Sequence, residues 1–194
     1  MSVIRAFIAI DLPQEILQCL DDVSQHLMEE FGGVPIRWVP VENIHLTLKF
    51  LGDVSESNIE MLTDILKSIA INVKQFEFSV GGLGAYPKPH RPRVIWVGVE
   101  APHELMIAQR SIESEMSRLG YARERRPFNP HLTLGRLSRH STNQDIRNIA
   151  ELINNNTVGY LGSALATSFH MYRSDLKPSG AVYTKLFSAK LSEK

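Results

Sequence analysis

The segment Asn-x-His-Leu-Thr-Leu occurs twice in this chain of 194 residues, as Asn43–Leu48 and as Asn129–Leu134. The two copies differ only at their second position, where Ile44 corresponds to Pro130. In an extended strand, successive side chains point to opposite faces. Each copy therefore presents a histidine and a threonine on one face and two leucines on the other. The leucines indicate a face toward a core, and the His/Thr pairs indicate a shared polar surface.

Two histidines on opposite sides of one phosphorus atom suit acid/base chemistry at a phosphodiester. Imidazole has an unperturbed pKa of about 6.5, so it can hold or release a proton near neutral pH. Each such group contributes a rate factor of roughly 10²–10⁴. The hydroxyls of Thr47 and Thr133 can donate hydrogen bonds to the non-bridging oxygens. We therefore expect His45 and His131 to form one composite site that cleaves or forms a phosphodiester without a metal.

The motif has two other interpretations, a structural role and a metal site. A single histidine in a half-buried strand is usually a structural polar residue, and His26, His103, His140 and His170 are interpreted in that way. Two histidines from different strands could also bind zinc, but neither motif has an Asp, Glu or Cys on the same face to complete a typical set of ligands. The repetition of both residue types and of their face favours catalysis.

Strands must carry these motifs, and the surrounding pattern predicts an α+β fold with mostly antiparallel sheets. Residues 3–12, 44–51 and 131–137 are apolar or alternate as buried strands do. Apolar residues recur at helical spacing within 13–31, 55–69, 102–119 and 141–153. Several of the expected strands follow one another without a helix between them, which favours antiparallel pairing.

Glycine and proline mark the expected connections between these elements. Gly52-Asp53 is expected to close the strand of the first motif. The segment Gly81–Pro92 contains three glycines and three prolines, so we expect a loop there that forms one rim of a groove. Two further strands, over 157–173 and 182–191, are expected on either side of a Pro-Ser-Gly turn.

The composition is that of a globular protein with one core. Hydrophobic residues make up 43% and charged residues 22% of the chain, and 21 Lys and Arg balance 21 Asp and Glu. A zero net charge argues against wrapping of a long polyanion but leaves room for a local basic groove. Cys19 is the single cysteine, which fits a reducing compartment. With no signal-like start and no long apolar stretch, we expect a cytoplasmic protein with no membrane span. The length suits one domain over 1–194 in which two lobes share a core, and we expect a monomer.

With its flanking residues, the pair of H-x-T-x motifs resembles the two-histidine (2H) phosphoesterase superfamily. More narrowly, the chain resembles the RNA 2′,3′-cyclic phosphodiesterases, also called 2′-5′ RNA ligases. The resemblance spans nearly the whole chain. It is carried by four segments: Phe7–Pro13, Arg37–Pro40 running into His45–Gly52, Arg91–Gly98, and Phe128–Arg136.

The resemblance implies a bilobed, pseudo-two-fold fold in which mostly antiparallel sheets line a central groove and helices lie outside. It also implies hydrolysis of a 2′,3′-cyclic phosphate on RNA ends or nucleotides to a 2′-phosphomonoester, with no metal and no cofactor. By residue match, His45 is expected to protonate the departing 3′ oxygen and His131 to activate water. Thr47 and Thr133 are expected to hold the phosphate.

Two further residues, Arg136 and Phe7, are candidates for substrate binding. Arg136 matches an arginine close to the phosphate, but strict alternation puts it on the face opposite His131. It must therefore lie past a bulge or past the strand end to reach the groove. Phe7 could stack on a base or lie in the core. The arginines in the segment 123–126 could attract an RNA backbone or could form an ordinary solvated loop.

The motifs also fit two alternative functions. By microscopic reversibility, the same groups could join a 2′,3′-cyclic phosphate to a 5′-hydroxyl as a 2′-5′ linkage. The absence of a G-x-x-x-x-G-K-[ST] segment argues against ATP-driven joining. The second alternative is a non-catalytic module that binds RNA ends. An aromatic content of 8% and the zero net charge weaken it.

Overall fold

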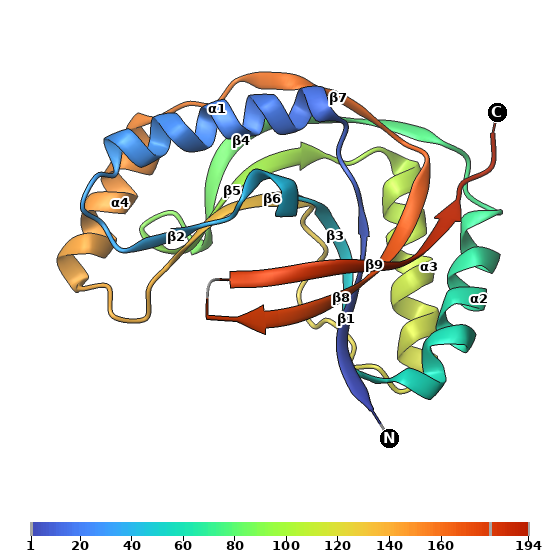
Figure 1. Ribbon diagram of the computed structural model, residues 1–194. Coiled ribbons are helices and arrows are strands. Elements are labelled where there is room, and N and C mark those ends of the chain that lie inside the picture. The colour runs from blue at the N-terminus through green and yellow to red at the C-terminus, as the bar shows by residue number, and fades with distance from the viewer. Residues whose placement is uncertain (1, 179, 194) are drawn as a thin grey trace.

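The computed structural model describes residues 2–178 and 180–193, which form two antiparallel sheets with helices outside them (Figure 1). The first sheet has the strand order β3 (Leu46–Ser55), β1 (Val3–Ile10), β8 (Ser168–Lys177), β9 (Gly180–Lys190). The second sheet has the order β2 (Ile36–Trp38), β6 (His131–Leu137), β5 (Arg91–Glu100), β4 (Phe76–Lys88), β7 (Tyr160–Ala166). The predicted α+β class with antiparallel pairing is confirmed.

Each sheet is covered by two helices on its outer face. The helices are α1 (Gln14–Glu30), α2 (Ile59–Ala70), α3 (His103–Arg118) and α4 (Asn143–Asn155), and the short 3-10 turns are η1 (Val41–Asn43) and η2 (Glu56–Asn58). Figure 1 shows α2 and α3 together at one side, where they contact the first sheet, and α1 and α4 at the other, where they contact the second. One continuous cluster of buried apolar side chains includes residues from both halves of the chain. Within the described residues, no helix combines the length and apolar character that crossing a membrane requires.

The segment Gly81–Pro92 was predicted to be a loop, and this prediction was wrong. β4 continues through it to Lys88 and pairs with β5 as a long hairpin. Gly82, at φ +80°, lies in a bulge between Gly81 and Leu83, which explains how a glycine-rich segment stays within the sheet.

Two other boundaries also differ from the expectation. β3 does not end at Gly52 but runs on to Ser55. Gly52 adopts φ +73° beside a bulge at Leu51, and this conformation lets the strand continue its pairing with β1. The stretch 157–173 divides into β7 and β8, which belong to different sheets. Of the predicted Pro-Ser-Gly turn, Ser179 lies outside the described residues.

On β3, an extra residue interrupts the alternation immediately after the threonine of the first motif. Thr47 lies opposite Ala9 and Lys49 opposite Ile8, so Leu48 has no partner of its own on β1. A bulge of this kind reverses which residues face inward. Leu46 and Leu48 are buried before it, whereas Lys49 is turned inward after it and is only 4% exposed.

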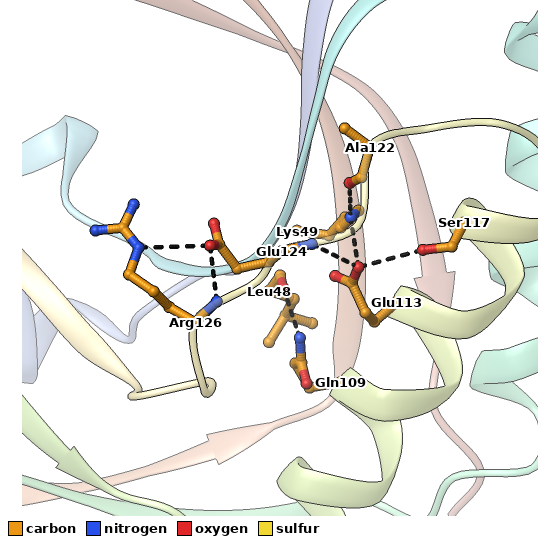
Figure 2. Close-up of polar contacts among 8 residues, drawn as sticks. All are labelled: Leu48, Lys49, Gln109, Glu113, Ser117, Ala122, Glu124 and Arg126. Atoms are coloured by element: carbon orange, nitrogen blue, oxygen red, sulfur yellow. Dashed lines mark hydrogen bonds and ion pairs between the residues drawn. The ribbon is translucent and has the colours of Figure 1, made fainter.

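The buried Lys49 is part of a polar cluster between β3, α3 and the segment that leads to the second motif (Figure 2). Its Nζ donates to Glu113 Oε1 at 2.8 Å and to the carbonyl oxygen of Ala122 at 2.6 Å. Glu113 Oε1 also accepts from the main-chain N–H of Glu124 at 3.0 Å. One turn earlier on α3, Gln109 donates to the carbonyl of the bulge residue Leu48 at 3.4 Å. Helix α3 thus fixes both the bulge after the first motif and the segment before the second.

Candidate active site

Both predicted histidines are oriented by the same main-chain contact. His45 Nδ1 lies 2.8 Å from the carbonyl oxygen of Asn43, and His131 Nδ1 lies 2.8 Å from that of Asn129. A carbonyl oxygen only accepts hydrogen bonds, so Nδ1 of each ring carries the proton. Nε2 is therefore the nitrogen that each ring has available for proton transfer, and the repeat in sequence is a repeat in geometry.

His45 is surrounded by aromatic side chains of the first sheet. The ring of Phe7 stacks on the imidazole, with centroids 4.7 Å apart and planes 22° apart. Tyr183 from β9 meets the imidazole edge-on at 5.3 Å. Tyr172 from β8 stacks on Phe7 at 5.3 Å. These contacts fix the plane of the His45 ring.

Of the two alternatives for Phe7, stacking on a base or burial, the structure favours burial. This residue is only 2% exposed, because His45, Tyr172 and Tyr183 cover it, and no face is open to a ligand. Phe50 lies opposite Phe7 across the strand pair, and the residue is 64% exposed. Ala9 and Phe7 are two residues apart on β1 and point to the same face. Their partners on β3, Thr47 and Phe50, therefore share that face as well.

His131 lies against the β4–β5 hairpin. Tyr86 meets its imidazole edge-on at 4.9 Å, and the indole of Trp96 lies 6.2 Å away. Trp96 can pack this closely because β4 has no side chain at Gly84, where an added Cβ would be 2.3 Å from the indole. Tyr86 Oη and Trp96 Nε1 are both buried without a partner among the described residues.

Arg136 reaches the face of His131 by means of a bulge. Thr133 lies opposite Trp96 and Arg136 opposite Val94, with the extra residue Leu134 between them. β5 itself keeps its alternation, so Val94 and Trp96 point to one face, and their partners on β6 must do the same. The positive charge of Arg136 accordingly acts on both histidines. The sequence-based requirement for a bulge at this point is met.

The environments of the two histidines lower both pKa values but differ in one respect. Burial is the main cause of the lowering at His45 and at His131, and the nearby charge of Arg136 adds to it. The hydrogen bond from each Nδ1 to its main-chain carbonyl opposes the shift. At His45, the negative charge of Asp11 opposes it further. His45 is therefore the ring whose protonated form has a carboxylate to stabilise it.

Asp11 is held in place behind His45 by two strands of the first sheet. Its Oδ1 accepts from the hydroxyl of Tyr172 at 2.5 Å, and its Oδ2 accepts from Lys185 Nζ at 2.6 Å. Burial would raise the pKa of Asp11, but these two hydrogen bonds bring it below its usual value. The carboxylate is thus ionised near neutral pH. Asp11, His45, Tyr172 and Tyr183 line one pocket, so the carboxylate and the imidazole face the same open space.

Several of these residues were not identified from the sequence. Tyr172 and Tyr183 come from the last two strands, far from either motif in the sequence, and Tyr86 lies in the segment predicted to be a loop. Asp11 directly follows the first strand, and Trp96 lies at the centre of an alternating strand. An acidic residue at a strand end was the one signal available for Asp11.

The histidines are not part of a recognisable group of metal ligands among the described residues. Within residues 2–178 and 180–193, no three or more His, Cys, Asp or Glu side chains are grouped as ligands of one ion. The predicted independence from metal stays a prediction.

The family model described as LigT like Phosphoesterase matches this chain twice, at residues 10–96 and 97–183. Each match contains one copy of the motif. An RNA 2′,3′-cyclic phosphodiesterase of Methanothermobacter thermautotrophicus is 33% identical over 183 residues, which cover 94% of this chain and 96% of the relative. One from Escherichia coli K12 is 32% identical over 184 residues, which cover 94% and 93%.

Solved structures agree with these relationships. The crystal structure of E. coli LigT in apo form has a TM-score of 0.76 and 28% identity, covering 99% of both chains. The structure of E. coli LigT complexed with 3′-AMP has a TM-score of 0.76 and 28% identity, covering 98% of this chain and 99% of that one. The bilobed 2H fold is thereby confirmed. With its two matched halves, one motif in each, the chain belongs to the LigT-like family of 2H phosphoesterases.

Proposed function

We propose that this protein hydrolyses terminal 2′,3′-cyclic phosphates of RNA to 2′-phosphomonoesters, with His45 as general acid and His131 as general base. The observation that carries the proposal is that both histidines are held in the same way, by Nδ1 on a main-chain carbonyl, so that both Nε2 atoms are available for proton transfer. The guanidinium of Arg136 is close enough to both rings to lower their pKa values. The curated relatives named RNA 2′,3′-cyclic phosphodiesterase support the substrate class.

In the proposed reaction, His131 Nε2 takes a proton from water as the water oxygen attacks phosphorus. The bond from phosphorus to O3′ breaks, and His45 Nε2 gives its proton to O3′. One water is consumed, and the phosphate remains on O2′. The hydroxyls of Thr47 and Thr133, together with Arg136, would hold the non-bridging oxygens and offset the charge that develops on them.

The surroundings of the rings support this order of acid and base. The charge of Asp11 favours the imidazolium form of His45, which a proton donor needs. Within the described part of the chain, no carboxylate contributes to the pKa shift of His131, and Arg136 favours its neutral form. A proton acceptor needs that neutral form.

The exposed ring of Phe50 offers a flat apolar surface on the same face as Thr47. We propose that it stacks on the base of the terminal nucleotide, in place of the buried Phe7. Base stacking on an aromatic side chain contributes about 1–3 kcal/mol. Phe50→Ala should therefore raise KM for a nucleoside 2′,3′-cyclic phosphate more than it lowers kcat.

The central test uses His45→Ala and His131→Ala, with the exposed His26→Ala as control. Each active-site variant should lose a factor of roughly 10² or more in kcat on a nucleoside 2′,3′-cyclic phosphate. A substrate with sulfur in place of O3′ tests the assignment, because a thiolate leaves without protonation. His45→Ala should regain activity on it, and His131→Ala should not. Full activity of either variant on the oxygen substrate would refute the proposal.

We also propose that the protein acts as a cytoplasmic monomer with a single domain. Both histidines come from one chain, and one core joins the two halves, so a second subunit is not needed to complete the site. Sedimentation of the active protein at a mass well above 21.9 kDa would contradict the monomer.

A further inference from the structure

Two arginines lie directly opposite each other where the second sheet borders the site. Arg37 of β2 pairs in register with Arg136 of β6, and both side chains are exposed. Directly opposed residues of antiparallel strands point to the same face. On β2, Ile36 and Trp38 pack toward the core, so Arg37 points away from it, to the face that carries Thr133 and Arg136.

Neither arginine is neutralised by a neighbouring carboxylate. The ion pairs found within residues 2–178 and 180–193 involve neither Arg37 nor Arg136. Like charges directly opposite each other weaken strand pairing. The pair therefore has an electrostatic cost in the free protein, and a bound anion would relieve it.

The two arginines differ in their distance from the histidines. The charge of Arg136 acts on His45, His131 and Tyr183, so its guanidinium lies near both imidazoles, between which the proposed function places the reacting phosphate. The charge of Arg37 contributes to none of these shifts, and β2 is the outermost strand of its sheet. Arg37 is thus one strand farther out, on the same face.

We propose that Arg37 binds the phosphodiester that joins the terminal nucleotide to the rest of the RNA, so that the site prefers oligoribonucleotide ends to free nucleoside 2′,3′-cyclic phosphates. This inference rests on the proposed function. A planar guanidinium can bind a phosphate through two parallel hydrogen bonds, which makes arginine well suited to this contact. A mononucleotide has no phosphate at that place and gains nothing from Arg37.

The experiment compares two substrates that end in the same nucleoside. One is the nucleoside 2′,3′-cyclic phosphate, and the other is the dinucleotide with one internal phosphodiester. For Arg37→Gln, kcat/KM should fall about tenfold on the dinucleotide, the equivalent of one charge-assisted hydrogen bond. On the mononucleotide it should stay within about twofold. Arg110→Gln, an exposed arginine on α3, is the matched control and should change neither value.

Two further measurements show whether the phosphate itself is the partner. For the wild-type protein, kcat/KM should be lower on a dinucleotide with an uncharged methylphosphonate linkage than on the charged dinucleotide. Arg37→Gln should not lower kcat/KM on the methylphosphonate substrate any further. The slope of log kcat/KM against log salt on the charged dinucleotide should become shallower by about 0.7, as expected for one lost contact to a single strand. Arg37→Lys should retain part of the preference, and Arg37→Glu should remove it completely.

The outcomes separate the two proposals. If the wild-type protein turns over neither substrate, the proposed function fails. If it turns over both and Arg37→Gln affects them equally, or affects neither, the role of Arg37 is refuted while the proposed function stands. Unchanged circular dichroism of Arg37→Gln excludes misfolding as the cause of a loss on both substrates.

Discussion

Replacement of Lys49 by methionine should destabilise the protein more than most single substitutions. The Lys49 side chain is 3% exposed and that of Glu113 is 14% exposed, with 2.8 Å between Nζ and Oε1. Methionine has nearly the same length and volume, so the change removes the charge and leaves little cavity. The Glu113 carboxylate would then be left nearly buried without its cation.

Loss of one partner from a buried ion pair costs about 3–5 kcal/mol, because the remaining charge is uncompensated. Glu113 keeps its contacts with Glu124 N and Ser117 Oγ, at 3.0 and 3.3 Å, which offset part of this. We therefore expect Lys49→Met to lose about 3 kcal/mol of unfolding free energy. In the double variant Lys49→Met/Glu113→Leu, apolar side chains replace the whole pair, and most of the loss should be recovered.

Urea unfolding followed by fluorescence measures these differences in unfolding free energy, from the midpoint of the transition and the slope of free energy against urea concentration. The matched control is Arg118→Met, because Arg118 pairs with Glu115 at 3.1 Å on the same helix but is 74% exposed. That variant should lose less than about 1 kcal/mol. The reasoning is refuted if Lys49→Met loses no more than Arg118→Met, or if the double variant is less stable than Lys49→Met. Trypsin should also cut the segment 121–130 faster in Lys49→Met than in the control, since Lys49 anchors it at Ala122.

Two further perturbations follow from the site. Asp11→Asn removes the charge that raises the pKa of His45, so this pKa should fall. Because the acid must be protonated, the alkaline limb of the kcat/KM profile should shift to lower pH; a shift to higher pH would refute the assigned role. Gly84→Ala places a methyl group 2.3 Å from the Trp96 indole and should cost about 1–3 kcal/mol in urea unfolding, with reduced activity. Gly159→Ala, with no atom within 4 Å of the added carbon, should change stability by less than about 0.5 kcal/mol.

The motif repeat made the centre of the site predictable. The identity of the two copies and the alternation of their residues were enough to place both histidines beside threonines on a polar face. The strand at His131–Leu137 has the predicted bounds. The expectation that Arg136 needs a bulge came from the same alternation, since strict alternation would have pointed it into the core.

The parts that were missed depend on contacts between distant segments. The segment Gly81–Pro92 at the turn end of the β4–β5 hairpin was predicted to be a loop, because glycine and proline usually interrupt strands. Yet Pro87 and Pro92 lie opposite each other near its end, and Gly84 makes room for an indole from the next strand. The aromatic side chains Tyr172 and Tyr183 pack around His45 from β8 and β9. Their positions depend on how the β8–β9 hairpin joins the first sheet. No local pattern encodes that arrangement.

The orientation of the histidines has a consequence for tolerance to mutation. The group that holds each Nδ1 is a peptide carbonyl, at residues 43 and 129. Every amino acid supplies that carbonyl, so no substitution at either position deletes it. The tautomer of each ring is therefore encoded in the path of the backbone. Random mutagenesis should find many acceptable residues at 129 and fewer at 43, where the Asn43 side chain also donates to the carbonyl of Ala181 at 3.2 Å. Inactive variants are expected among changes that redirect the chain just before each strand.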